Sequence, residues 1–347
     1  MTQDHTSASG HARVACFGEM LLRLSAPRGE RLCATGELNV HVGGAEANVA
    51  LALAHLGHAA AMITVLPDNA LGALARAELR RHAVDTAGVR TGPGRMGLYF
   101  LERGAGQRPA RVIYDREHSA FSRAMSESLP WDRLLQGCTW LHVSGITAAL
   151  SAAGSDAVLQ AVRAARARGM RIAVDCNYRP SLWQARAAEA GALLRGLAEE
   201  ADVLFASAHD LRLMLGEALP AEAGGPESFA QVARLALARF APLHWVATTF
   251  RLEDGADEQG LSAACLSREG LFRSRAYPLR GIVERIGSGD AFAAGVLHGA
   301  LIGVGPAHAV EFGAACACLK HSVATDFSSA TIAEVEALLR GETALRR

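Results

Sequence analysis

The chain has 347 residues, 50% hydrophobic and 20% charged, enough for one large α/β domain or two domains. Its 35 Lys and Arg residues balance 35 Asp and Glu residues, so no overall basic charge indicates nucleic acid or an anionic membrane as a partner. The seven cysteines form no CxxC pair and no stretch reaches the roughly 20 apolar residues of a membrane span, so we expect a soluble, cytoplasmic protein with reduced thiols.

Strand-like and helix-like patterns alternate along most of the chain. Residues 1–12 are polar and small, without the apolar core of a signal peptide, and we expect them to be a tail. The predicted elements, in chain order, are a strand with a short continuation at 13–25, a helix at 45–57, a strand at 60–66, a helix at 70–84, a strand at 139–145, a helix at 151–169, a strand at 170–177, a helix near 186–199, a strand at 201–207, a helix at 226–240, a strand at 243–250 and helices at 289–303, 306–321 and 331–340.

Strands separated by helices predict an α/β fold with a central, mainly parallel sheet covered on both faces. Two hairpin-like segments interrupt the alternation, one at 96–117 and one at 260–277. Their apolar and polar residues alternate, which favours strands with one solvated face. We therefore expect them outside the central sheet, in a small β layer that could act as a lid.

The stretch "GSGD", residues Gly287, Ser288, Gly289 and Asp290, opens a small, apolar helix. Unpaired backbone N–H groups at a helix N-terminus bind anions, and the carboxylate beside them could act as a base next to a bound phosphate. The alternative interpretation is an Asp that caps the N-terminus of a core helix. The motif alone does not decide between the two.

A second glycine motif lies near the N-terminus, in "HVGGAEANVALALAHLG". Gly43 and Gly44 allow close approach of the backbone, and Glu46 and Asn48 stand at the start of a helix. These side chains could bind a polyhydroxylated ligand, or they could simply belong to a glycine turn and a capped helix. The dinucleotide fingerprint GxGxxG and the GxxxxGK[ST] loop are absent from the sequence, which disfavours a nicotinamide dehydrogenase.

Together the two motifs resemble the PfkB family of sugar kinases, from about residue 13 to residue 340. The resemblance implies a single ribokinase-like domain over 13–340, with lid strands from about 20–43 and 94–117 and a tail at 341–347. It implies ATP and Mg²⁺ as cofactors, Asp290 as the base, and the amides of Gly287 to Gly289 as an anion cradle. Gly43, Gly44, Glu46 and Asn48 would then contact the sugar.

Further segments resemble the 2-dehydro-3-deoxygluconokinases of that family, among them "GAGQRPARVIYDRE", "DCNYRPSLW" and "IVERIGSGDAF". Such a keto acid carries a carboxylate, which requires a cation in the pocket. Tyr114 and Arg116 share one face of a strand, and Arg116 could form a fork-shaped pair with that carboxylate. The alternative for Arg116 is a solvated strand charge. The resemblance also places Tyr99 at the substrate.

The end of the strand at 170–177 carries Asn177 and Arg179, at the edge where open α/β sheets bind ligands. The resemblance places both at the nucleotide, with Arg179 near the transferring phosphate and Asn177 also near the substrate. Three further residues, expected just after the strand at 243–250, would contact the nucleotide: Thr248, Thr249 and Arg251. By the same resemblance, Asp326 in "KHSVATDF" is an acid on the substrate side.

The chain departs from the family pattern at two places. The N-x-x-E motif that helps to order Mg²⁺ is best matched by "SAHD" at 207–210, so a metal role for Asp210 is only a weak interpretation and the metal ligands stay open. Glu284 stands where an Asp is usual before G-x-G-D, which leaves dependence on a monovalent cation open.

The sequence therefore predicts an ATP-dependent kinase that phosphorylates the 6-hydroxyl of 2-dehydro-3-deoxy-D-gluconate. Alternatives are a fructokinase or ribokinase type of PfkB kinase and a non-catalytic sugar-binding regulator on the same scaffold. The gluconate or galactonate stereochemistry stays open. We expect a homodimer or higher oligomer formed through an apolar lid, and neither nucleic acid nor membrane as a partner.

Overall fold

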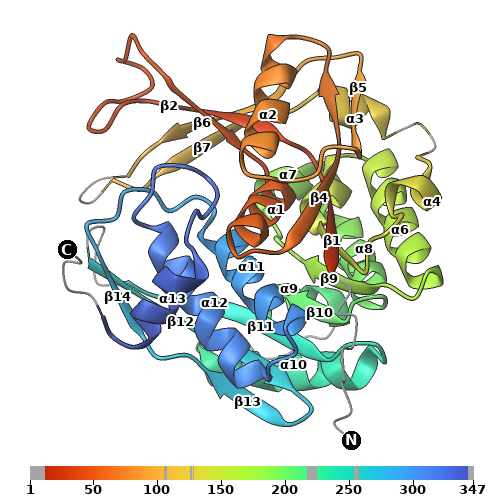
Figure 1. Ribbon diagram of the computed structural model, residues 1–347, viewed down its shortest axis with the longest axis vertical. Helices are drawn as coiled ribbons and strands as arrows, with labels where there is room; N and C mark the ends of the chain where they lie inside the picture. Colours follow the sequence, from red (N-terminus) through yellow and green to blue (C-terminus); the bar gives the residue numbers. More distant parts are fainter. Residues whose placement is uncertain are drawn as a thin grey trace, which may run out of the picture.

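The structure is a computed structural model that describes residues 12–104, 108–125, 127, 129–216, 225–253 and 258–342. Most of the expected terminal tails, and residues 105–107 of the segment 104–117, therefore lie outside the described residues. At the centre of the described chain is a ten-stranded sheet with the order β13-β12-β11-β10-β9-β8-β1-β4-β5, in which β14 also pairs with β12 (Figure 1). Its strands are β1 (Arg13–Phe17), β4 (Ala59–Pro67), β5 (Val89–Gly92), β8 (Trp140–Ser144), β9 (Arg171–Asp175), β10 (Val203–Phe205), β11 (Trp245–Glu253), β12 (Glu258–Ser267), β13 (Gly270–Arg273) and β14 (Tyr277–Arg280).

The strands β5, β4, β1, β8, β9, β10 and β11, in sheet order, run parallel. The side chains of β1, β4, β8, β9 and β10 are mostly buried on both faces of the sheet. In β1, Val14 and Cys16 point into one hydrophobic cluster, while Ala15 and Phe17 point into the other. Successive strand residues face opposite sides, so an unbroken apolar run belongs in a sheet covered twice. The predicted mainly parallel sheet is confirmed.

Helices cover both faces of this sheet. One face packs against α1 (Ala45–His55), α2 (Ala70–Arg81), α11 (Ser288–Leu301), α12 (Pro306–Lys320) and α13 (Ile332–Leu339). The other face packs against α3 (Ala120–Ala124), α4 (Trp131–Leu134), α5 (Gly145–Leu150), α6 (Ala152–Ala167), α7 (Pro180–Trp183), α8 (Ala187–Ala198), α9 (Ala208–Leu215) and α10 (Pro226–Arg239). A 3₁₀ turn, Gln184–Arg186, joins α7 to α8. Within the described residues, no helix combines the length and the apolar character that crossing a membrane requires.

A second sheet of four strands has the order β3-β2-β6-β7 and forms the predicted small β layer, called the lid below. Its strands are β2 (Leu21–Ser25), β3 (Asn39–Gly43), β6 (Gly97–Glu102) and β7 (Arg111–Asp115). In Figure 1 these strands project beside α1 and α2, away from the central sheet. Tyr99 of β6 lies directly opposite Tyr114 of β7, so both aromatic rings face the same side of the lid.

Two strand predictions are wrong. The segment 13–25 is not one strand with a continuation, because β1 ends at Phe17 and β2 begins at Leu21 in the other sheet. Gly18 lies between the two strands and packs closely against α1, since a Cβ on this residue would lie 2.0 Å from a carboxylate oxygen of Glu46. A single apolar run therefore supplies strands to two sheets.

The segment 260–277 lies in the central sheet and not in the lid. Strand β12 pairs antiparallel with β11, β13 and β14, and it carries the sheet beyond its parallel part. Leu261 and Ala263 belong to one hydrophobic cluster, and Ala264 and Leu266 to the other. Burial on both faces explains why the second hairpin does not join the lid, although its alternation resembles that of the first.

Candidate active site

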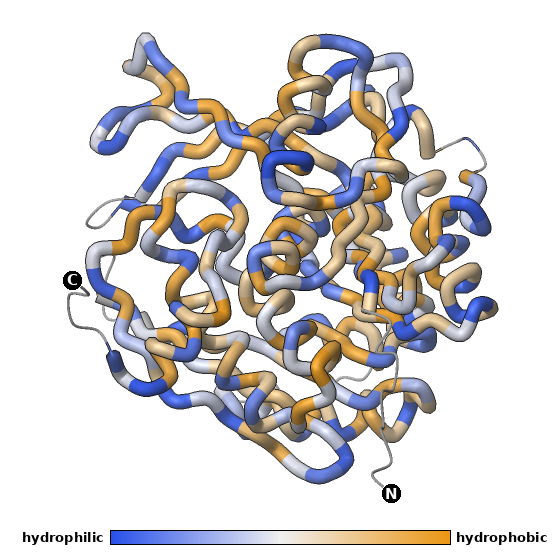
Figure 2. Tube along the Cα trace, in the orientation of Figure 1, coloured by the Kyte–Doolittle hydropathy of each residue, from blue (hydrophilic) through white to orange (hydrophobic). Residues whose placement is uncertain are grey.

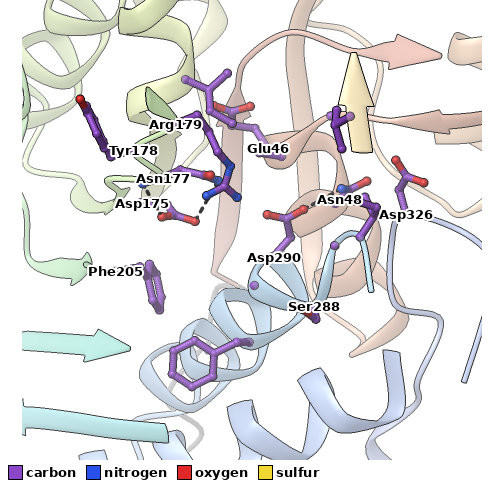
Figure 3. A pocket seen from close by; sticks show the side chains of 18 of the residues that line it. Glu46, Asn48, Asp175, Asn177, Tyr178, Arg179, Phe205, Ser288, Asp290 and Asp326 are labelled. Carbon is purple, nitrogen blue, oxygen red and sulfur yellow. Dashed lines mark hydrogen bonds between the residues drawn. The ribbon is translucent and has the colours of Figure 1, made fainter. Parts of the chain in front are cut away.

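A cavity of about 810 Å³ opens at the ends of β9 and β10 and beside the middle of β11, between the central sheet and the lid. Ligands of open α/β sheets bind at this carboxyl edge of the strands. Every candidate residue named from the sequence lines the cavity except Gly43 and Glu284, so segments from seven separate parts of the chain meet there. Figure 3 shows the part of this cavity around Asp290 and Asp175.

The glycine turn before α11 forms one wall of the cavity. Gly287 is the residue that caps the helix, with φ of 82°, and a Cβ on it would lie 1.5 Å from the carbonyl oxygen of Asp326. Only glycine fits there. The main-chain N–H of Ser288 already donates to the carbonyl of Arg285 at 3.3 Å. Helix geometry leaves the N–H groups of the next two residues, Gly289 and Asp290, for an anion at the positive end of the helix.

Asp290 lies in the first turn of α11 and is 9% exposed. Its Oδ2 accepts a hydrogen bond of 2.7 Å from Nδ2 of Asn48 on α1. Burial raises the pKa of Asp290 to about 7, although the bond from Asn48 and the charge of Arg179 both oppose the rise. A carboxylate with such a pKa exchanges protons near neutral pH, as a general base must.

Asp175 ends β9 and faces the same cavity, and the sequence analysis did not single it out. Its Oδ1 accepts the main-chain N–H of Asn177 at 3.0 Å. Burial raises the pKa of Asp175 to about 8, and the negative charge of Asp290 adds to the rise while Arg179 opposes it. The position of Asp175 at a strand end was the available signal, the same one that identified Asn177.

Arg179 and Asn177 follow β9, as predicted. Figure 3 shows the guanidinium of Arg179 between the carboxylates of Asp175 and Asp290, where it offsets part of their charge. Asn177 has a φ of 42°, and its side-chain Oδ1 is buried without a hydrogen-bond partner among the described residues. A buried acceptor of this kind is costly unless a ligand supplies a donor.

The lid forms the opposite wall through Tyr99, Tyr114 and Arg116. The guanidinium of Arg116 lies 5.9 Å from the ring centre of Tyr114. Its Nε donates to Oε2 of Glu19 at 2.8 Å, so Arg116 is not the solvated strand charge of the alternative interpretation. Glu19 is the residue between β1 and β2 that also accepts the hydroxyl of Ser119. This pair uses only part of the five N–H groups of a guanidinium, which leaves donors for a ligand anion.

The two polar side chains at the start of α1, Glu46 and Asn48, differ in their hydrogen bonds. Glu46 accepts both the N–H and the hydroxyl of Ser144, at 3.1 and 2.5 Å, and burial raises its pKa. It therefore ties α1 to the end of β8 as well as lining the cavity. Asn48 keeps a buried Oδ1 without a hydrogen-bond partner in the described part of the chain. That acceptor suits a hydroxyl of a sugar.

Asp326 is 1% exposed and lies beneath the lid. Its carboxylate accepts the hydroxyl of Tyr99 and forms an ion pair with Arg23 of β2, Nε to Oδ1 3.0 Å. Burial raises the pKa of Asp326 although Arg23 opposes the rise. A Cβ on Gly43 would lie 2.2 Å from Oδ2 of Asp326, so Gly43 serves the close packing of this acid and does not line the cavity.

The two positions that depart from the family pattern have structural partners. Asp210 forms a capping box at the start of α9, where the N–H and hydroxyl of Ser207 both donate to its Oδ2 at 2.8 Å. Glu284 is paired with Arg23 at 2.5 Å and with Arg103 at 3.0 Å. Burial disfavours its charge, but the two arginines outweigh this and lower the pKa of Glu284.

Thr248, Thr249 and Arg251 line the cavity from β11. They lie inside this strand, which runs from Trp245 to Glu253. The predicted strand at 243–250 already contained Thr248 and Thr249, so only Arg251 differs, because the strand extends past residue 250. Side chains of β11 itself therefore form this wall of the cavity, and not a loop after the strand. Among the residues that the structure describes, no three His, Cys, Asp or Glu side chains form a group that could hold a metal ion.

The comparisons with known proteins agree with this geometry. The pattern of the pfkB family carbohydrate kinases matches residues 11–329. A 2-dehydro-3-deoxygalactonokinase from Haloferax volcanii is 34% identical over 337 residues, which cover 95% of this chain and 97% of that protein. A 2-dehydro-3-deoxygluconokinase from Bacillus subtilis is 28% identical, with 88% of each chain covered.

Among solved structures, the crystal structure of a 2-dehydro-3-deoxygluconokinase from Thermotoga maritima is similar at a TM-score of 0.90 and 37% identity. The match covers 95% of this chain and 100% of that chain. Both glycine motifs and the cavity between them lie within the matched residues. The resemblance noted in the sequence is confirmed, and the chain belongs to the pfkB family of carbohydrate kinases.

Proposed function

We propose that this protein transfers the γ-phosphoryl group of ATP to the 6-hydroxyl of 2-dehydro-3-deoxy-D-gluconate. The product is 2-dehydro-3-deoxy-6-phospho-D-gluconate, with ADP. One observation carries the proposal: a single cavity holds a buried acid at a helix N-terminus on one wall and a lid arginine on the other. The first suits phosphoryl transfer to a hydroxyl, and the second suits an acceptor with a carboxylate.

Asp290 is the proposed general base. Its Oδ2 is held by Asn48, and its pKa of about 7 lets the unprotonated form take the hydroxyl proton as the new O–P bond forms. The N–H groups of Gly289 and Asp290 and the guanidinium of Arg179 would face the transferring phosphoryl group. Such prearranged donors stabilise the charge that spreads over its oxygens.

The lid supplies the proposed specificity for a sugar acid. Arg116 is held in place by Glu19 and by the ring of Tyr114, which fixes the direction of its remaining N–H groups. A carboxylate can accept two parallel bonds from such a fork. Tyr99, fixed by its bond to Asp326, would contact the same end of the substrate. Gly44, Glu46 and Asn48 would contact the sugar hydroxyls.

The remaining wall, formed by Thr248, Thr249 and Arg251, would bind the nucleotide. When bound, Mg²⁺ neutralises charge on the phosphates of ATP. It prefers phosphate oxygens, water and one or two carboxylates to a cage made by the protein alone. Asp175 lies beside Asn177 and Arg179 and is the proposed carboxylate. Each of its oxygens accepts one bond from Asn177, whereas Oδ2 of Asp210 accepts two bonds from Ser207.

We also propose that two copies associate through their lids, in the cytoplasm where ATP is available. One face of the lid carries an apolar row across all four strands, because Val40, Leu24, Phe100 and Ile113 lie side by side in the register. Figure 2 shows hydrophobic stretches along these strands where they project from the body of the molecule. Val40 is 50% and Ile113 42% exposed, as expected for a surface that a partner covers.

The test is an assay that couples ADP release to a detectable reaction, with Mg²⁺ and ATP against a panel of acceptors. The panel contains 2-dehydro-3-deoxygluconate, its galactonate epimer, fructose, ribose and adenosine. Turnover with the gluconate form above all others supports the proposal, and a preference for the galactonate form moves the substrate to the epimer. Turnover confined to a neutral sugar would refute the role of Arg116, while binding without turnover would favour a sugar-binding regulator.

A further inference from the structure

The only lysine of the sequence is Lys320, and all other residues among the 35 Lys and Arg are arginines. Lys320 is the last residue of α12, and its side chain is fully buried, at 0% exposed. Lysine is almost never fully buried unless it is paired. The one compact cation of the chain therefore lies inside the protein, whereas its other basic positions use the larger guanidinium.

The ammonium group of Lys320 lies between two main-chain carbonyl oxygens. Its Nζ is 3.4 Å from the oxygen of Glu284 and 3.4 Å from the oxygen of Val323. Glu284 stands three residues before Gly287, the cap of α11, and Val323 stands three residues before Asp326. Lys320 thus joins the segment that enters the glycine turn to the segment that ends at the acid beneath the lid.

The two segments are also in direct contact beneath the turn. The backbone of Gly287 approaches Asp326 so closely that a Cβ would lie 1.5 Å from its carbonyl oxygen, and this Cβ would lie 3.4 Å from Cε of Lys320. The lysine stem therefore packs directly behind the turn that carries Asp290. A guanidinium is planar and larger than an ammonium, so an arginine would not fit this space without moving the turn.

The charges around Lys320 keep its ammonium protonated at neutral pH. Burial lowers the pKa of Lys320 to about 8, and Arg23 also lowers it, while the carboxylates of Glu284, Asp326 and Asp290 oppose the fall. At neutral pH a positive charge consequently lies next to the glycine turn, at a residue that does not line the cavity. It adds to the potential of the helix N-terminus that we assign to the phosphoryl group.

Oxygens of main-chain carbonyls are also the ligands that replace the water shell of a potassium ion. We propose that Lys320 is a built-in monovalent cation, a positioning residue that holds the glycine turn against the Asp326 segment so that phosphoryl transfer needs no free monovalent ion. This inference rests on the proposed function for its catalytic consequence, but not for the cation site itself. The alternative is that Lys320 only stabilises the carbonyl end of α12.

Two variants separate these roles. Lys320→Ala removes the charge and opens space for an ion, whereas Lys320→Met removes the charge and fills the space. Each is assayed at matched ionic strength in potassium, ammonium, sodium and tetramethylammonium chloride. We expect both variants to lose kcat by about 10- to 100-fold, the range for groups that orient a site from behind it, with smaller changes in the KM values. Potassium or ammonium should restore part of kcat in Lys320→Ala alone, and the native enzyme should be equally active in all four salts.

Three results would overturn the proposal: a native enzyme that requires potassium or ammonium, a Lys320→Met variant with native kcat, or a Lys320→Ala variant that no cation restores. The first of these needs no variant, so the proposal is testable even if both substitutions prevent folding. Tetramethylammonium is too large to enter between the two carbonyl oxygens and serves as the control cation.

Thermal unfolding gives a readout that does not depend on catalysis. Potassium and ammonium, but not tetramethylammonium, should raise the Tm of Lys320→Ala and leave the Tm of the native protein unchanged. If no acceptor is phosphorylated, the proposed function fails while this shift still decides the cation site. If the Tm of both proteins changes equally in all four salts, the proposed role of Lys320 as a built-in cation is refuted instead.

Discussion

Asn48 donates a hydrogen bond of 2.7 Å to Asp290, and this bond joins the two glycine motifs of the chain across 242 residues of sequence. The side-chain NH₂ of Asn48 donates this bond, and a donor favours the ionised form of the carboxylate that accepts it. The bond therefore lowers the pKa of Asp290 and opposes the effect of burial. It also fixes Oδ2, which would leave Oδ1 of Asp290 for the substrate hydroxyl of the proposed reaction. The first glycine motif therefore orients the acid of the second.

Replacing Asp290 by Asn tests the base directly. Asn keeps the size of the side chain and can accept the bond from Asn48, so we expect a folded protein with native Tm or higher. Because Asn cannot take a proton from the hydroxyl, kcat should fall by about 10²–10⁴. The control is Asp156→Asn, which changes an exposed Asp of α6 outside the cavity. A native kcat in Asp290→Asn would show that Asp290 is not the general base.

The pH dependence of kcat follows from two buried groups on either side of the glycine turn. A base must be unprotonated to act, so kcat should rise as the pH increases through about 7, the pKa of Asp290. It should fall again as the pH increases through about 8, where Lys320 loses its proton and its charge. Asp175, with a pKa of about 8, titrates in the same range, so the Lys320 variants are needed to assign this limb. Steady-state kinetics across this range should thus give a narrow, bell-shaped plot of kcat against pH.

The variants of Lys320 assign the alkaline limb. In Lys320→Ala restored by potassium, the cation no longer titrates, so the fall above about pH 8 should disappear while the acid limb stays. Since the chain has a single lysine, tag-free protein labelled with [¹³Cε]lysine gives one side-chain resonance, and its titration measures the pKa of Lys320 directly. A midpoint near that of a free lysine would assign the limb to another group.

The lid arginine decides the class of acceptor. Arg116→Ala should raise the KM for the keto acid by about 10- to 100-fold, the value of a bond between charged groups, and change the KM for ATP little. Arg111→Ala is the matched control, because Arg111 is an exposed arginine of β7, the strand that ends just before Arg116, and it does not line the cavity. Equal effects on both substrates would contradict a contact between Arg116 and the carboxylate.

The arrangement of the lid predicts its partner. Ile113→Asp places a charge in the apolar row and should convert a dimer into monomers in gel filtration at micromolar concentration. Leu235→Asp on α10 is the control, since Leu235 has a similar exposure of 38% but lies far from the lid in sequence and outside its sheet. A native protein that elutes only as a monomer would end this part of the proposal.

Much of the fold and site is predictable from local patterns. The alternation of strands and helices gives the parallel sheet, glycine-rich turns at helix starts point to Asp290 and Asn48, and the end of a strand points to Asn177. These signals are local because a buried strand or a helix N-terminus requires certain residues within a few positions.

The features that were missed depend on the packing of distant segments. Nothing local to residues 13–25 says that one apolar run feeds two sheets, because both parts are equally apolar. Only the resemblance to the family implied lid strands from about residue 20, where β2 is found. The amphipathic pattern of 260–277 resembles that of the lid hairpin, but burial on both faces by α10 and α12 places it in the central sheet. The pairing of Glu19 with Arg116 spans 97 residues and has no signal within either segment.

Two glycines of the turn offer a matched pair of variants that separates folding from catalysis. A Cβ on Gly287 would meet the carbonyl of Asp326 at 1.5 Å, whereas a Cβ on Gly289 would meet nothing within 4 Å. Gly287→Ala should thus destabilise the protein by about 2 kcal/mol or more, through strain at a positive φ and the clash with the backbone. Thermal unfolding measures this difference.

Gly289→Ala should fold with native Tm, because its methyl group points into open space and helix interiors prefer Ala to Gly. That space lines the cavity, so the methyl group would stand where we place the phosphoryl group. We expect kcat to fall by about tenfold or more as the amides of the turn are screened from the phosphate. A stable Gly289→Ala enzyme with native kcat and native KM for ATP would show that the phosphate binds elsewhere, because an added methyl cannot share its place with a phosphate oxygen.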